Sequence, residues 1–129
     1  MALKRVKIDQ GIAPATLAEA IVEGMQEKKG TNIVVLDLRE IDHAVSSFFV
    51  ICEGNSNTQV DAIANSVHEY VKEKLGDKPF RSEGYENAEW ILLDYIDVVV
   101  HVFRKDVRSF YRLETLWGDA KRKDIEDLF

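Results

Sequence analysis

One histidine interrupts an apolar run of the kind that forms buried strands. The run DVVVHVF, residues 97–103, places His101 between valines. A histidine there can serve as a metal ligand, a catalytic base or part of a recognition surface, or it can be a core residue with a satisfied hydrogen bond. The other two histidines of the chain are His43 and His68, and no two of the three histidines form an HxxxH, HxH or HExxH pair. The sequence therefore predicts no metal site.

Nucleophilic chemistry has no better support. Cys52 lies in the apolar run FFVIC, which predicts a buried thiol, and buried thiols have raised pKa values and react poorly. The serines Ser46, Ser47 and Ser56 lack a G-x-S-x-G elbow. With no nucleophile beside it, His101 is not expected to act as a catalytic base. We predict no catalytic residue.

Two short motifs are candidates for phosphate or magnesium. The stretch EGNSN, residues 53–57, follows a strand and opens a helix, where anions bind well, but it contains neither GxxxxGK[ST] nor GxGxxG. Helix capping alone is the favoured role. Asp94 and Asp97 flank a turn and could hold magnesium, although aspartates at such turns usually accept hydrogen bonds from the backbone. No cofactor is predicted.

The segment after residue 103 combines positive charge with aromatic side chains. Arg108 and Arg112 are four residues apart, so they share one face of a helix, and Tyr111 lies beside that face. A solvated face and a contact with phosphate or an acidic partner are both open. Trp90 and Trp117 stand at element ends, where large aromatic residues are core edges or interface anchors. The sequence predicts a basic patch at the start of this segment, made of Arg104, Lys105, Arg108 and Arg112.

The elements that position these residues follow from apolar periodicity and from start and stop signals. The run at 47–53 is apolar on both faces, so we expect it to be covered on both. A very short turn joins 90–95 to 97–103, which predicts antiparallel neighbours. The order predicts an α/β fold (α+β-like order), with a mixed β-sheet of about four to five strands flanked by helices. Helices are predicted at 14–29, 56–75 and 105–118, and strands at 32–39, 47–53, 80–83, 90–95 and 97–103.

Composition limits the function classes. The chain has 129 residues, 46% of them hydrophobic, and a net charge of −6, which fits a basic protein partner better than non-specific binding of nucleic acid. We expect a loose arm at 1–12, a single domain at 13–118 and a charged, frayed tail at 119–129. With one cysteine, no secretory signal and no membrane-spanning run, a cytoplasmic protein without a membrane partner is expected.

The second half of the chain contains the stretch GYENAEWILLDYIDVVVHVFRKDVRSFYRLETLWGDA, residues 84–120, and through it resembles the ribosomal silencing factor family, also called the Iojap family. The family pattern runs from a glycine through W-x-x-x-D and D-x-x-V-H-V-F to R-x-x-Y-x-L-E-x-L-W. Upstream, FFVICEGNSNTQVDAIA is similar to the family's F-V-I-x-x-G-x-S-x-x-Q-V-x-A-I-A. The resemblance spans residues 14–118. The matching positions include Gly84, Trp90, Asp94, Asp97, His101, Phe103, Arg108, Tyr111, Glu114 and Trp117.

Two positions depart from the family pattern. Many members have glycine where this chain has Ile96, and a β-branched residue enters left-handed turns badly, so a different turn type is expected. Many members also have aspartate at the position of Ser47, so a charge-based role there is not expected in this chain.

The resemblance implies a fold like the nucleotidyltransferase core, without the catalytic G-S and D-x-D motifs. It also implies a translational repressor that docks on universal large-subunit protein fourteen of the large ribosomal subunit and blocks joining of the small subunit. His101 is expected to bond Asp94 or Glu114. A nucleotide-binding protein or weak nucleotidyltransferase, a homodimer paired through an apolar sheet edge, and a minor contact with ribosomal RNA stay open. The predicted partner-binding residues are Trp90, Asp94, Tyr95, Asp97, His101, Arg108, Tyr111, Glu114 and Trp117.

Overall fold

A computed structural model describes residues 11–128. Residues 1–10 of the predicted arm lie outside the described residues. The expected mixed α/β architecture is confirmed. The helices are α1 (Pro14–Glu27), α2 (Asn57–Leu75), α3 (Lys105–Tyr111) and α4 (Leu113–Leu116), and the strands are β1 (Thr31–Asp37), β2 (Phe48–Gly54), β3 (Arg81–Glu83), β4 (Trp90–Asp94), β5 (Val98–Arg104) and β6 (Lys121–Ile125).

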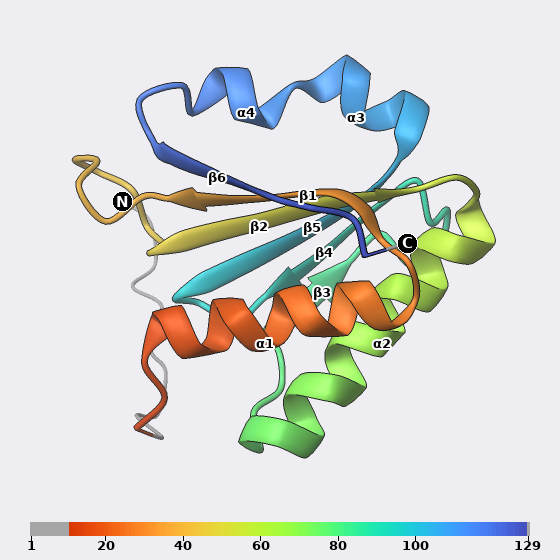
Figure 1. The fold of residues 1–129 in the computed structure, drawn as a ribbon, viewed down its shortest axis with the longest axis horizontal. Coiled ribbons are helices and arrows are strands. Elements are labelled where there is room, and N and C mark those ends of the chain that lie inside the picture. Colours follow the sequence, from red (N-terminus) through yellow and green to blue (C-terminus); the bar gives the residue numbers. More distant parts are fainter. Residues whose placement is uncertain (1–10, 129) are drawn as a thin grey trace.

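One mixed sheet forms the centre of the molecule. Its strand order is β3-β4-β5-β2-β1-β6, and only β2 and β5 pair in parallel. The predicted antiparallel pairing of β4 with β5 is confirmed. The long helices α1 and α2 cover one face, and the short helices α3 and α4 lie over the other (Figure 1). As expected for an apolar strand, β2 is covered on both faces.

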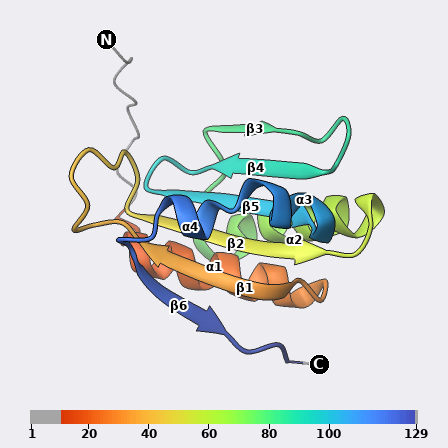
Figure 2. The same ribbon diagram turned by 90° about the horizontal axis from the view of Figure 1, so that it is seen from above.

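The sixth strand corrects two expectations, since we expected four to five strands and a frayed tail at 119–129. Lys121–Ile125 instead form β6, which pairs antiparallel with β1 (Figure 2). The segment KRKDI gives no apolar alternation because β6 is an outer strand, and four of its five side chains are exposed. Only Ile125 packs against the core.

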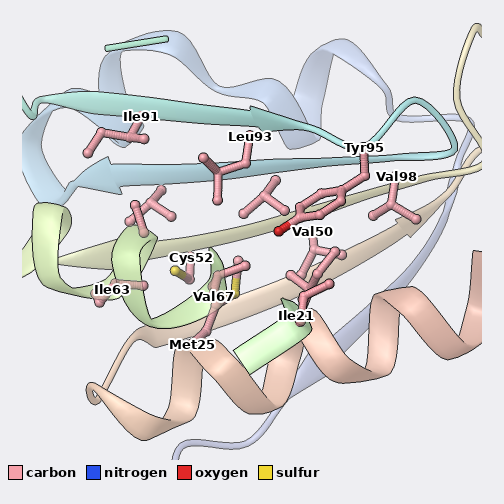
Figure 3. Close-up of a cluster of buried hydrophobic side chains, with 14 of the residues drawn as sticks. Ile21, Met25, Val50, Cys52, Ile63, Val67, Ile91, Leu93, Tyr95 and Val98 are labelled. Atoms are coloured by element: carbon pink, nitrogen blue, oxygen red, sulfur yellow. The ribbon is translucent and has the colours of Figure 1, made fainter. Parts of the chain in front are cut away.

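The main core lies between the sheet and helices α1 and α2. It contains Cys52, Tyr95 and Met25 among aliphatic side chains (Figure 3). Gly24 permits the close crossing of the helices, because a Cβ there would lie 2.9 Å from the Cα of Val67. The burial of Cys52 was predicted from the sequence and is confirmed.

The ends of the long helices follow local signals with one exception. Ser56 caps α2 by accepting a hydrogen bond from the Gln59 amide at 3.1 Å, which confirms the predicted helix cap, while Gln59 Oε1 accepts from the Asn55 amide at 2.7 Å. Gly76 ends α2 in the left-handed conformation. After α1, Lys29 has a positive φ of +59°, a conformation in which glycine is the usual residue. Gly30 instead packs tightly, since a Cβ there would lie 3.1 Å from the Met25 carbonyl oxygen.

Replacement of Gly84 by alanine tests the close approach of two backbone segments. Gly84 has φ +94°, and a Cβ would lie 2.0 Å from the carbonyl oxygen of Trp90. Gly84→Ala should lower the free energy of unfolding by about 3 kcal/mol, measured by urea denaturation. Gly76→Ala is the matched control, because φ there is +67° but nothing lies within 4 Å. It should cost about 1 kcal/mol, and equal losses would rule out the steric contact at Gly84.

Candidate functional site

The face of the sheet under α3 and α4 carries a connected group of rings. Strand alternation directs Val98, Val100 and Val102 to the main core, while Phe103 belongs to the second core beneath α3 and α4. The register pairs Trp90 with Phe103 across the β4–β5 hairpin. We call six residues the aromatic cluster: Phe49, Trp90, His101, Phe103, Tyr111 and Trp117.

Contacts within the aromatic cluster connect the sheet to both short helices. The Trp90 ring stacks on Phe103 with centroids 4.8 Å apart and contacts Tyr111 of α3 at 4.7 Å. Phe49 of β2 meets Trp117, just after α4, edge to face at 5.7 Å. Such pairs contribute about 0.5–1.5 kcal/mol beyond their buried area. The short helices therefore rest on a stacked aromatic layer.

His101 lies at the centre of this cluster and is 4% exposed. The Trp90 indole N–H donates to His101 Nδ1 at 3.1 Å, so the proton of the neutral ring belongs on Nε2. Nε2 is buried and has no hydrogen-bond partner among residues 11–128. The expected bond to Asp94 or Glu114 is wrong, because Trp90 takes the place of a carboxylate. Burial lowers the pKa of His101 to about 4, against the weaker raising effect of the Asp94 charge.

Arg108 is buried rather than part of a basic surface patch. Its Nη1 donates to the Asn32 carbonyl at 2.5 Å and to Glu53 Oε1 at 3.2 Å, and its Nε donates to Glu114 Oε1 at 2.8 Å. Its side chain is 10% exposed. The prediction of Arg108 as a surface cation is wrong, since two carboxylates and a carbonyl already bind it. Glu114 is likewise held inward, with 15% of its side chain exposed.

The predicted helix at 105–118 is broken in two. Arg112 has φ +50° and ψ +52°, a left-handed conformation that ends α3 and begins α4. Its amide N–H donates to the Arg108 carbonyl at 3.1 Å, which closes the last turn of α3. The break ends α3 at Tyr111 and begins α4 at Leu113. Phe110 and Leu116, which an unbroken helix would place in its apolar stripe, are both exposed.

The β4–β5 turn accounts for three further predicted residues. Asp94 is 1% exposed and accepts hydrogen bonds from the Ile96 amide at 2.7 Å and from Arg81 at 3.3 Å, so the predicted turn chemistry is confirmed. Ile96 keeps a left-handed φ of +73°, contrary to the expected change, and Ser46 Oγ holds its carbonyl at 2.9 Å. Tyr95 is 1% exposed in the main core, and Asp97 is half-buried.

Exposed apolar residues on α3 and α4 form a surface of which only Tyr111 was predicted from the sequence. Phe110 is 80% exposed and Leu116 is 73% exposed. Tyr111, also on α3, is 49% exposed and meets Phe110 edge to face at 5.3 Å. We call Phe110, Tyr111 and Leu116 the docking patch. The partly exposed Trp90 and Trp117 lie beside it in the aromatic cluster. Large exposed apolar side chains on neighbouring elements are typical of binding surfaces.

The candidate metal and thiol chemistry can be compared with the geometry of residues 11–128. No group of three or more His, Cys, Asp and Glu in this range is placed to hold a metal ion. Burial raises the pKa of the Cys52 thiol far above its usual value. No helix in the described range has the length and apolar character needed to cross a membrane.

The pH dependence of stability should report the buried His101. Between its unfolded pKa of 6.5 and its folded pKa of about 4, the unfolded chain binds a proton that the folded chain does not. The contribution of the neutral ring is therefore complete above pH 6.5 and is lost as the pH falls toward 4, by about 3 kcal/mol in total. In urea denaturation, the free-energy difference between the wild type and His101→Gln should shrink from pH 7 to 4.5. A difference that does not change with pH would contradict this environment.

Comparison with known proteins gives a consistent result. The family model described as "Ribosomal silencing factor during starvation" matches residues 12–129. The ribosomal silencing factor RsfS of Halalkalibacterium halodurans is 44% identical over 110 residues, covering 85% of this chain and 92% of the relative. The chloroplastic protein Iojap of Zea mays is 35% identical over 115 residues, covering 89% of this chain and 49% of the relative.

A solved structure has the same fold. The crystal structure of a protein from Chromobacterium violaceum superposes with a TM-score of 0.77 at 37% identity, covering 83% of this chain and 88% of that chain. The sequence pattern, the family match and the shared fold agree. The chain belongs to the ribosomal silencing factor (RsfS/Iojap) family.

Proposed function

We propose that this protein represses translation by binding the large ribosomal subunit through universal large-subunit protein fourteen. The observation that carries the proposal is the docking patch, in which Phe110 and Leu116 are mostly exposed on two short helices. An interface needs a central apolar anchor, and a rigid layer behind it limits the entropy lost on binding. The names of the relatives, which are ribosomal silencing factors, support a ribosomal partner.

Steric exclusion is sufficient for repression. A domain of this length has a radius of gyration of roughly 14 Å, so its body is about 35 Å across. A body of that size on the joining face keeps the small subunit away without any chemical step. We therefore propose that the chain acts by occupancy and not as an enzyme, on a fold like a nucleotidyltransferase core that lacks the D-x-D motif.

The predicted contact residues divide into two groups. Trp90, Asp97, Tyr111 and Trp117 reach the surface at least in part, and we propose that they contact the partner together with Phe110 and Leu116. The buried residues support these contacts from below: Asp94, Tyr95, His101, Arg108 and Glu114. The net charge of −6 favours encounter with a basic ribosomal protein.

Sedimentation with separated ribosomal subunits tests the function. The protein should migrate with the large subunit and not with the small one, and its addition should reduce the amount of joined particles. Pelleting with neither subunit, or unchanged joining at saturating protein, would refute the proposal. The same experiment with isolated protein fourteen identifies the partner.

Truncation of the docking patch should weaken binding without unfolding the chain. Phe110→Ala and Leu116→Ala remove side chains that are 80% and 73% exposed, so each should leave stability within about 0.5 kcal/mol. Each should weaken binding to the large subunit by about 1–2 kcal/mol, measured by titration. Phe80→Ala is the matched control, because Phe80 is 59% exposed but precedes β3 at the far edge of the sheet. Equal effects at Phe80 and Phe110 would place the interface elsewhere.

A further inference from the structure

We propose that the groove between helices α3–α4 and strand β6 binds the phosphate backbone of ribosomal RNA beside the docking patch, through Arg112 and Arg122. The proposal rests on the proposed function and adds a second class of contact to it. The docking patch would bind protein, and the groove would bind the neighbouring RNA.

The distribution of charge along the chain first suggests this surface. Residues 104–125 contain seven Lys and Arg residues and four Asp and Glu residues, a net charge of +3 in a chain of −6. The rest of the chain therefore carries −9. Helix α1 alone has Glu19, Glu23 and Glu27 and no basic residue. Such a molecule approaches a polyanion with its C-terminal segment forward and its long helices away.

The groove gathers the donors that bind phosphate. It has a volume of about 640 Å³. Ser109, Arg112 and Thr115 line it from the α3–α4 side, and Arg122 lines it from β6. Guanidinium and hydroxyl groups are the usual protein partners of phosphate oxygens in nucleic-acid complexes. The groove lies beside the docking patch, since Arg112 directly follows Tyr111 and Thr115 directly precedes Leu116.

The two arginines are available to an incoming anion. The Nε of Arg112 donates to the Ser109 carbonyl at 3.3 Å, and no carboxylate within residues 11–128 pairs with this exposed guanidinium. Arg122 pairs with Asp124 at 2.9 Å, but these side chains are 50% and 69% exposed, so the pair is weak and exchangeable. The carboxylates of Glu53 and Glu114 at the base of the groove are already bound to Arg108.

The left-handed conformation of Arg112 gives the groove its shape. Had the helix continued through residue 112, α3 and α4 would form one rod. The break instead places Arg112 at the junction of the two helices, on the wall that faces β6. The strand β6 supplies the opposite wall through its pairing with β1. Both of the features that sequence periodicity missed therefore build the same groove.

The salt dependence of binding to large subunits tests the proposal. The double variant Arg112→Gln/Arg122→Gln should bind about tenfold more weakly near 0.1 M salt, because it releases fewer counterions. The slope of log affinity against log salt concentration should fall by about 1 for each cation removed. The matched control is Lys72→Gln/Lys74→Gln, which makes the same change of charge on α2. Arg112→Lys/Arg122→Lys keeps the charge and should retain the slope.

Isolated ribosomal protein fourteen separates this contact from the docking patch. The Arg112→Gln/Arg122→Gln variant should bind that protein as the wild type does, while losing affinity for the whole subunit. Equal losses of affinity for both targets would mean that the groove contacts protein fourteen. Losses of affinity equal to those of the α2 control would mean that only the net charge of the chain matters. Either result, or an unchanged salt slope, overturns the RNA contact. Failure of the wild type to bind large subunits would instead overturn the proposed function.

Discussion

The buried guanidinium of Arg108 connects the short helices to the sheet through hydrogen bonds. Helices of seven and four residues are too short to be stable alone, so tertiary contacts must hold α3 and α4 in place. Arg108 joins α3 to the carbonyl of Asn32 in β1, to Glu53 in β2 and to Glu114 in α4. Loss of one partner from a buried ion pair costs about 3–5 kcal/mol, because the remaining charges stay desolvated. The position of the docking patch therefore depends on the contacts that Arg108 makes with Asn32, Glu53 and Glu114.

The two faces of the sheet differ in how much apolar surface they bury. Helices α1 and α2 bury the larger apolar core, which accounts for most of the stability. On the opposite face, part of the apolar surface stays exposed to solvent, since Phe110 and Leu116 are not buried. The aromatic cluster fills the layer beneath them with contacting rings. In it His101 accepts a hydrogen bond from Trp90. Such a packed layer suits the proposed role of the surface, which is to bind a partner by its shape.

Local signals predicted the elements that depend on local physics. The two long helices follow from apolar periodicity and capping, and the β4–β5 hairpin follows from the short turn between two apolar runs. The failures all involve long-range contacts or unusual backbone. Arg108 meets Asn32 and Glu53 at sequence separations of 76 and 55 residues, which no periodicity encodes. Arg112 has a left-handed conformation, but no glycine stands there to predict it from the sequence. Strand β6 shows no apolar alternation because it is an outer strand. The predicted contact residues consequently included five that are largely buried.

The charged outer strands also bear on the behaviour of the protein at high concentration. The central strands are almost wholly apolar, a composition that invites growth of a sheet from one molecule to the next. Here one end of the sheet is β3, three exposed residues with Arg81 and Glu83, and the other is β6, which carries Lys121, Arg122 and Lys123. Another copy adding a strand would therefore meet exposed, charged side chains and not an apolar edge. The strand that forms one wall of the polar groove is thus also an edge that discourages growth of the sheet.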